Sequence, residues 1–247
     1  MGKPDSAPPA LTGRSALFLD YDGTLVGLAP TPAEAVADAE LRALLAGLRT
    51  RLDGAVAIVT GRPVADIDHF LAPLRLTVSG LHGLVRRRED GTTSEAEVPA
   101  DLLPPVRAAF AEFVAAHSGT LMEDKRLSLA LHYRQAPHLE ASAIGLAEAL
   151  AGASDGRLRL QRGKMVVELL PRGSDKGDAI RALLGETGFT ARLPVFVGDD
   201  VTDEAGFRSV NALDGISVRI GDGPSDARYR LPDVAALRVW LRQGLPA

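Results

Sequence analysis

Short apolar runs alternate with amphipathic stretches in the first third of the chain. Three of these runs have the length and composition of strands buried on both faces: 16–19, 55–59 and 76–79. Leucines at helical spacing over 41–48 predict an amphipathic helix, and Thr31-Pro32-Ala33-Glu34 before them is a typical helix start. Residues 64–71 predict a second helix. This order of elements favours a parallel sheet with right-handed crossovers.

The pattern changes in the middle of the chain and resumes near residue 174. The middle segment alternates apolar and polar side chains loosely, which predicts hairpins with helices on one side. Its expected strands flank the Asp90-Gly91 turn and cover 121–124, 127–133, 157–161 and 165–169, with helices over 104–116 and 141–150. The later part predicts helices from 174–177 to 184, from Asp203 and over 234–241, with strands over 195–197 and 216–220.

These changes predict an α/β fold in which a smaller α/β module is inserted into a larger domain. The larger domain, a parallel sheet flanked by helices, is expected over 14–83 and 173–247, and the inserted module over 84–172. Residues 1–13 are rich in Pro, Ala and Gly and are expected to form a disordered lead-in.

Composition narrows the possible chemistry. The 247 residues are 46% hydrophobic and 24% charged, with a net charge of −4, so no basic field is available to attract nucleic acid or a membrane surface. There is no cysteine, and the five histidines form no HExxH motif, which excludes thiolate zinc sites and disfavours zinc enzymes in general. Oxygen ligands, and therefore magnesium, are favoured. We expect a soluble, cytoplasmic, monomeric protein.

Four polar clusters follow predicted strands or begin predicted helices. In a parallel α/β sheet these positions meet at one edge, where phosphate groups and their cations bind. Each cluster alone is also compatible with an ordinary helix cap or turn. The clusters are Asp20 with Asp22, Thr60 with Arg62, Lys176, and Asp199 with Asp200 and Asp203.

Together the clusters resemble the four motifs of the haloacid-dehalogenase superfamily of phosphatases: DYDGT at 20–24, TGR at 60–62, DKG at 175–177 and GDDVTDE at 198–204. Three further stretches, 123–125, 131–134 and 163–169, resemble the cap of trehalose-6-phosphate phosphatases. The resemblance covers 16–241. It implies a Rossmann-like hydrolase core with an inserted cap of the C2B type.

The resemblance also implies roles for the core residues. Asp20 would attack phosphorus and Asp22 would serve as general acid and base. Mg²⁺ would be bound by the Asp20 and Asp199 carboxylates and the Asp22 backbone carbonyl. Thr60 and Lys176 would stabilise the phosphoryl group. In the second sphere, Asp200 and Asp203 would orient metal waters and Lys176.

Substrate contacts follow from the same resemblance: Tyr21, Asp22, Gly23, Arg62, Glu123, Lys125, Arg134 and Glu168. For His132 and Arg134, a solvated surface ion pair is an equal alternative. His82 is expected to be a hinge hydrogen-bonding residue, and Glu204 is either part of the site or a first-turn acid that favours the helix dipole. Leu84-Val85 departs from the family, which often has glutamate at this point.

The predicted function is Mg²⁺-dependent hydrolysis of trehalose 6-phosphate through an aspartyl-phosphate on Asp20. A phosphatase for sucrose, glucosyl-glycerate or mannosyl-glycerate phosphate is one alternative. A non-catalytic receiver or sugar-phosphate sensor is another, although Asp22 argues for turnover because a signalling domain needs no acid beside the phosphorylated residue.

Overall fold

The computed structural model describes residues 7–27, 35–163, 165–173 and 175–245. Its contacts divide the chain into two units. The core unit contains residues 1–95 and 175–247, and the inserted unit contains residues 96–174. The sequence analysis expected the insertion over 84–172, whereas these contacts divide the chain at 95/96 and 174/175.

The core unit is built on one eight-stranded sheet with the order β12-β11-β10-β1-β2-β3-β4-β5. The six strands from β12 to β3 are parallel, and β4 and β5 are antiparallel additions at one edge. The strands are β1 (Ser15–Leu19), β2 (Val56–Val59), β3 (Thr77–Gly80), β4 (Val85–Arg87), β5 (Thr93–Glu95), β10 (Leu193–Gly198), β11 (Ile216–Ile220) and β12 (Tyr229–Leu231).

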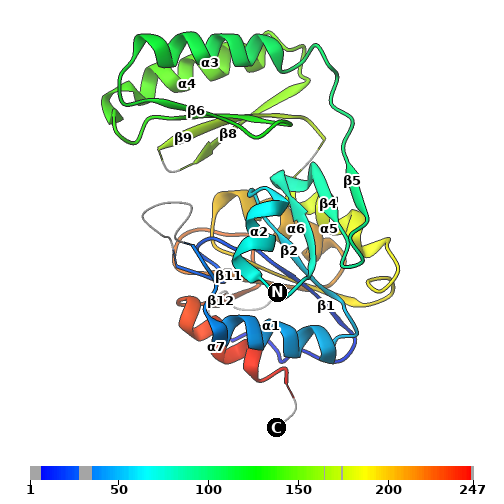
Figure 1. Cartoon of the computed structure of the whole chain (residues 1–247). Helices are drawn as coiled ribbons and strands as arrows, with labels where there is room; N and C mark the ends of the chain where they lie inside the picture. Colours follow the sequence, from blue (N-terminus) through cyan, green and yellow to red (C-terminus); the bar gives the residue numbers. More distant parts are fainter. Residues whose placement is uncertain (1–6, 28–34, 164, 174, 246–247) are drawn as a thin grey trace. The chain divides into compact units, whose positions relative to one another are not determined.

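Helices cover both faces of this sheet. Figure 1 shows α1 and α7 side by side on one face, with α5 and α6 packed together on the other. The helices are α1 (Ala39–Arg51), α2 (Val64–Leu71), α5 (Lys176–Leu184), α6 (Glu204–Ala212) and α7 (Val234–Arg242), with 3₁₀ turns η2 (Leu81–Gly83) and η4 (Val201–Asp203). Strand β1 is buried at all five positions, which explains its uninterrupted apolar sequence.

The hairpin around Asp90-Gly91 forms as predicted but belongs to the core unit. Gly91 has a positive φ of 91°, and β4 pairs with β3 on one side and β5 on the other. The inserted unit therefore begins at Ala96 and not at residue 84, because backbone pairing extends the core sheet past the expected boundary.

Three further expectations concern local structure. The described part of the lead-in, 7–13, is not disordered: Leu11 is 7% exposed, and the Pro9 carbonyl accepts a hydrogen bond from Trp240 Nε1 at 3.1 Å. The helix start expected at 31–34 lies outside the described residues, and α1 begins after the N-cap Asp38. Strand β12 was not predicted, since three residues carry no readable period.

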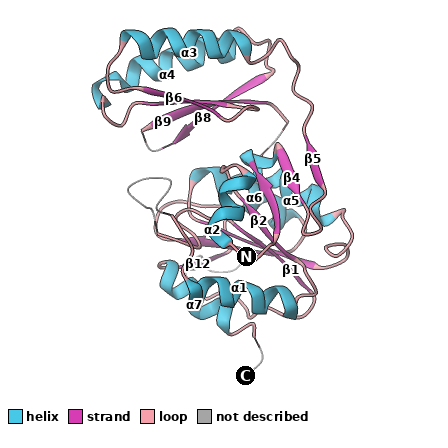
Figure 2. Cartoon of the chain, viewed as in Figure 1, coloured by secondary structure: helices cyan, strands magenta, loops and turns pink. Residues whose placement is uncertain are grey.

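The inserted unit is a four-stranded antiparallel sheet with the order β6-β7-β9-β8. Its strands are β6 (Leu121–Asp124), β7 (Leu129–His132), β8 (Leu158–Gly163) and β9 (Val166–Pro171), and its helices are α3 (Pro104–Ala116), η3 (Pro137–Leu139) and α4 (Glu140–Gly152). Figure 2 shows α3 and α4 together on one side of the sheet.

The two faces of the inserted sheet differ in polarity. Leu129, Leu131, Val167 and Leu169 pack with α3 and α4 in the core of this unit. Because side chains alternate along a strand, the residues between them lie on the opposite face. One row of paired residues there crosses all four strands: Glu123, Ala130, Glu168 and Gln161.

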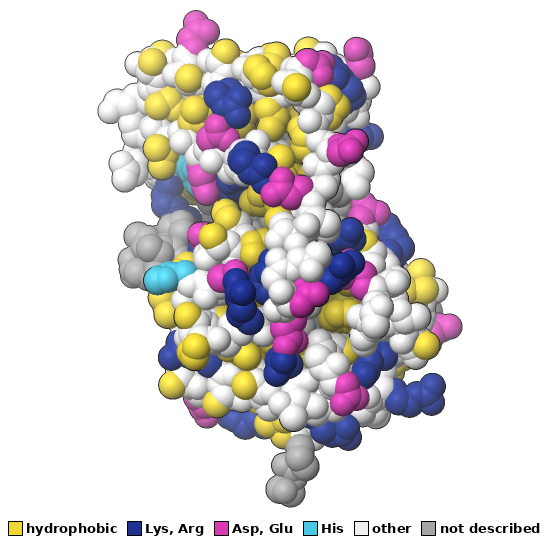
Figure 3. Space-filling model, turned by 45° about the vertical axis from the view of Figure 1, so that its right-hand side comes forward, with side chains coloured by type: hydrophobic (Ala, Val, Ile, Leu, Met, Phe, Trp, Pro, Cys, Tyr) yellow, Lys and Arg dark blue, Asp and Glu magenta, His cyan; other side chains and the backbone are white. Residues whose placement is uncertain are grey.

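The surface carries charges of both signs. Lys and Arg side chains are interspersed with Asp and Glu over the face drawn in Figure 3. None of the helices in the described part of the chain has the length and apolar character that a bilayer crossing requires.

Candidate active site

Asp20 lies where β1 ends, at the carboxyl edge of the parallel sheet. Its backbone N–H donates to the Val197 carbonyl at 2.9 Å and so continues the pairing of β1 with β10. The residue is 4% exposed. Its carboxylate accepts a hydrogen bond from Lys176 Nζ, with 2.7 Å between Nζ and Oδ1.

Lys176 is the first residue of α5 and is 3% exposed. Its position is fixed by Asp175, the N-cap of this helix, whose side chain accepts from the Asp178 N–H at 2.8 Å. Burial alone would lower the pKa of Lys176, but the carboxylates of Asp20 and Asp203 outweigh it and hold that pKa above its usual value. The ammonium therefore stays charged in the interior.

Asp203 links Lys176 to the loop after β10. Its Oδ1 lies 2.6 Å from Lys176 Nζ, and its Oδ2 accepts from the backbone N–H groups of Asp199 and Asp200 at 3.0 and 2.9 Å. Both oxygens are thus occupied by protein donors. Asp200 is exposed and is the N-cap of η4. Asp203 is well suited to orient Lys176 and the Asp199 backbone.

Asp199 faces Asp20 across the turn that contains Gly23 and Thr24. Thr24 Oγ1 lies 2.9 Å from Asp199 Oδ1 and 3.2 Å from Asp20 Oδ2. Gly23 has a φ of 79°, and a Cβ built on it would lie 2.1 Å from Asp199 Oδ2. Only glycine is compatible with this turn so close to the carboxylate.

Asp20, Asp199 and Asp203 form the carboxylate cluster, in which one ligand oxygen from each lies within 4.8 Å of the others. Burial raises the pKa of Asp20 well above its ordinary value, although Lys176 opposes this shift. Burial likewise raises the pKa of Asp199 to about 6, with Thr24 opposing and Asp203 adding to the rise. One lysine does not balance three carboxylates here, so the cluster is suited to bind a cation.

Arg62 forms a bidentate ion pair with Asp22. Its Nε and Nη2 each lie 2.6 Å from an Asp22 carboxylate oxygen, and its guanidinium carbon lies 5.0 Å from the centroid of the Phe70 ring. Burial opposes the charge of Arg62, but the Asp22 carboxylate outweighs this and raises the pKa of Arg62. Arg62, which was expected to contact substrate, thus holds Asp22, which was expected to act as the general acid.

Thr60 and Tyr21 differ in what they present to the site. Thr60 directly follows β2, and its Oγ1 accepts from the Arg62 N–H at 3.2 Å. Tyr21 is fully buried: its hydroxyl donates to the Ala35 carbonyl at 2.7 Å and its ring stacks on Phe70. The Tyr21 side chain, which was expected to contact substrate, is thus held in the core by Ala35 and Phe70.

His82 lies in η2 with a φ of 56°, and its ring lies against Gly61, where a Cβ would approach Nε2 to 2.5 Å. The segment expected to act as a hinge is thus packed closely against the TGR motif. Leu84 and Val85, which depart here from the family pattern, follow η2 and are both buried.

In the inserted unit, Glu168 is the centre of a buried polar group. It is 6% exposed, and its two carboxylate oxygens accept from Ser128 Oγ at 2.6 Å and Lys125 Nζ at 3.1 Å. Glu123 pairs with His132, with 2.9 Å between Oε2 and Nε2. This contact is compatible with a role of His132 in the sugar site and with a surface ion pair. Arg134 follows β7 and is exposed.

The sequence analysis assigned no role to two residues that contact predicted site residues, Thr24 and Ser128. Thr24 was part of the DYDGT motif but received no role, although the hydroxyl directly after the turn glycine was a visible signal. Ser128 carried no motif, and only the pairing of β7 with β9 places it beside Glu168.

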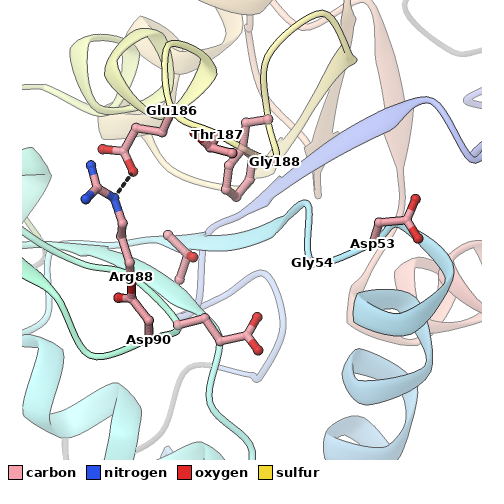
Figure 4. A pocket seen from close by; sticks show the side chains of 10 residues that line it. Asp53, Gly54, Arg88, Asp90, Glu186, Thr187 and Gly188 are labelled. Carbon is pink, nitrogen blue, oxygen red and sulfur yellow. Dashed lines mark hydrogen bonds and ion pairs between the residues drawn. The ribbon is translucent and has the colours of Figure 1, made fainter.

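A cavity of about 450 Å³ lies at the opposite, amino edge of the core sheet (Figure 4). It is lined by the loops that precede β2 and β10 and by the turn of the β4–β5 hairpin, and Arg88 Nε donates to Glu186 Oε2 there at 2.7 Å. Within the described chain, its lining includes none of the predicted site residues.

The sequence matches the trehalose-phosphatase family over residues 18–235. The chain belongs to the trehalose-phosphatase family. This membership confirms the resemblance drawn from the motifs and the expectation of a phosphatase.

Individual relatives agree with this family. The trehalose-6-phosphate phosphatase of Escherichia coli K12 is 39% identical over 241 residues, which cover 98% of this chain and 90% of the relative. A crystal structure titled trehalose-6-phosphate phosphatase related protein has a TM-score of 0.76 at 30% identity, covering 92% of this chain and 95% of the other.

A haloacid dehalogenase-like hydrolase from Bacteroides thetaiotaomicron shares the fold alone. It has a TM-score of 0.70 at 14% identity and covers 92% of this chain and 98% of its own. The predicted fold class is confirmed.

Proposed function

We propose that this member of the trehalose-phosphatase family is a Mg²⁺-dependent phosphatase that hydrolyses trehalose 6-phosphate to trehalose and phosphate. One observation carries the proposal: a buried Asp20 carboxylate is hydrogen-bonded to Lys176 beside a second carboxylate, Asp199, at the carboxyl edge of the sheet. A phosphate monoester is hydrolysed very slowly in water, so catalysis requires such a preorganised charge arrangement.

The donor set of the carboxylate cluster fits Mg²⁺, which prefers oxygen ligands. Asp20 and Asp199 would hold it, together with the Asp22 backbone carbonyl, whereas Asp203 uses both oxygens on protein donors. The ion would neutralise charge between the carboxylates and the phosphate and so favour the ionised form of both Asp20 and Asp199. Histidine and cysteine, the ligands typical of zinc, are not part of this cluster among the described residues.

Asp20 would act as the nucleophile. One of its carboxylate oxygens attacks phosphorus, the bond from phosphorus to the sugar oxygen breaks, and an aspartyl-phosphate remains. Lys176 stabilises the negative charge of this arrangement through its contact with Asp20, and Asp203 keeps the ammonium in place. Thr60 would donate to a phosphoryl oxygen.

Asp22 would move the protons. In the first step it gives a proton to the departing sugar oxygen, and in the second it takes one from the water that attacks phosphorus and releases Asp20. Arg62 pairs with both carboxylate oxygens of Asp22 and would set the orientation of this group. Gly23 permits the turn between the two aspartates.

The inserted unit would recognise the sugar. We propose that Glu123, Lys125 and Glu168 bind sugar hydroxyls, as carboxylates accept and an ammonium donates hydrogen bonds. Desolvation offsets much of the attraction in a buried ion pair, and the Lys125–Glu168 pair has side-chain exposures of only 13% and 8%. Arg134 is a fourth candidate contact.

A substrate panel tests the proposal. Phosphate release would be measured from trehalose 6-phosphate, sucrose 6-phosphate, glucosyl-glycerate phosphate, glucose 6-phosphate and an aryl phosphate, with Mg²⁺ and with chelator. We expect Mg²⁺-dependent release that strongly favours the trehalose ester. Preference for another ester would retain the core chemistry and overturn the sugar assignment. Absence of release from all esters would favour the sensor alternative.

A further inference from the structure

Gln161 shares a sheet row with the two carboxylates that the proposed sugar site uses. It pairs with Glu168 across β8 and β9, Glu168 pairs with Ala130, and Ala130 pairs with Glu123 across β7 and β6. All four therefore lie on the face of the inserted sheet that is opposite α3 and α4.

The neighbours of Gln161 on its own strand support this orientation. Leu158 and Leu160 pack into the core of the unit beneath the helices, which leaves the side chains of Arg159 and Gln161 on the polar face. Arg159 Nη1 donates to Gln161 Oε1 at 2.9 Å. The same amide also carries N–H donors, which complement the acceptor oxygens of the neighbouring Glu168.

The row has the dimensions and the chemistry of a sugar-binding surface. Three inter-strand spacings, together about 14 Å, separate Gln161 from Glu123, which exceeds the width of one sugar ring. Ala130, between the glutamates, is small and buried at 1% exposure, whereas Gln161 and Glu123 at the two ends of the row are partly exposed. A sugar hydroxyl can donate to a carboxylate and accept from an amide at once, so Glu168 and Gln161 complement each other as adjacent row members.

We infer that Gln161 is a specificity-determining residue of the sugar site, where its amide N–H donates to a hydroxyl oxygen of the sugar that Glu168 binds. This inference rests on the proposed function, because it assumes that the substrate is a sugar phosphate. Sites that hydrogen-bond a hydroxyl discriminate strongly against esters that lack it. Gln161 therefore acts on the choice of ester and leaves the phosphoryl chemistry of Asp20 unchanged.

The test compares Gln161→Ala and the similarly sized Gln161→Leu with the wild type, on the sugar phosphate that the wild type hydrolyses best and on an aryl phosphate. We expect kcat/KM for the sugar ester to fall about tenfold, the loss of one hydrogen bond, mainly through KM. For the aryl ester it should stay within about twofold. The control Gln135→Ala changes an exposed glutamine of the same unit and should alter neither.

Each outcome has a separate meaning. Equal losses on both esters, or no loss on the sugar ester, would overturn the role of Gln161 while leaving the proposed function in place. A lower melting temperature that accompanies equal losses would identify a structural role. If the wild type cleaves the aryl ester and shows no preference among sugar esters, the proposed sugar site itself fails, and with it this inference.

Discussion

Arg62 and Asp22 form the ion pair on which the proton-transfer part of the mechanism depends. The pair is bidentate and partly buried, with Arg62 held between the carboxylate and the Phe70 ring. Planar, two-point pairing fixes direction as well as distance, and lysine cannot reproduce it. The guanidinium therefore determines where the Asp22 carboxyl points.

Replacing Arg62 should affect esters according to their leaving group. In Arg62→Lys and Arg62→Ala, we expect kcat for the sugar phosphate to fall by about one to two orders of magnitude, because the sugar oxygen needs a proton from Asp22. An aryl phosphate leaves without that proton, so the first step should be affected less. Burst kinetics with both esters would check this. An equal loss on both would assign Arg62 to phosphate binding instead.

For individual residues, the sequence motifs indicated which side chains lie together at the sheet edge better than they indicated which of these side chains contact each other. Asp20, Lys176, Asp199 and Asp203 meet because they end or begin elements at one sheet edge, and the sequence order already indicates that edge. The Arg62–Asp22 pair joins two motifs that lie forty positions apart and depends on side-chain direction, which no local pattern contains.

Among the elements, the N-caps of α5 and α7 form a natural matched pair. Asp175 accepts from the Asp178 N–H and Asp233 accepts from the Ala236 N–H, each at 2.8 Å. Both bonds satisfy a free donor of the first helical turn. Only α5 begins with a residue of the candidate site, Lys176.

Removing each cap should therefore separate stability from activity. We expect Asp175→Ala and Asp233→Ala each to lower the free energy of unfolding by about 1 kcal/mol in urea titrations. Phosphate release at saturating substrate should fall several-fold for Asp175→Ala only, since its loss loosens Lys176. Similar activities in the two variants would show that the position of Lys176 does not depend on this cap.

Element prediction was accurate where the pattern was long or fully buried. Helices over 64–71 and 104–116 have the bounds that were predicted from sequence. The hairpin after residue 84 was recognised but given to the wrong unit, because its pairing partner β3 is set by tertiary structure and not by the turn. The three-residue β12 depends on β11 beside it.

For the whole molecule, the carboxylate cluster couples pH, metal and stability. Burial raises the pKa of Asp199 to about 6, above its ordinary value of 3.8. The contribution of this group to metal-free stability is therefore complete below about pH 4 and is lost as the pH rises through about 6. A cation that requires ionised Asp199 restores stability in that same range.

The gain in melting temperature on adding Mg²⁺ should consequently be larger at about pH 7.5 than at about pH 5. Calorimetry with and without Mg²⁺ at the two pH values measures this gain. In Asp199→Asn the gain should be small and similar at both. A gain that is equal at both pH values in the wild type would contradict the assignment of Asp199 as a metal ligand.

The most direct test of the central claim is to look for the phosphoryl group on Asp20. The protein would be mixed with Mg²⁺ and trehalose 6-phosphate, quenched in acid during turnover, digested and analysed by mass spectrometry. We predict one phosphoryl group on the peptide that contains Asp20, lost on hydroxylamine treatment, and neither this adduct nor phosphate release in Asp20→Asn. Sustained turnover by Asp20→Asn, or a phosphoryl group on another residue, would contradict the account.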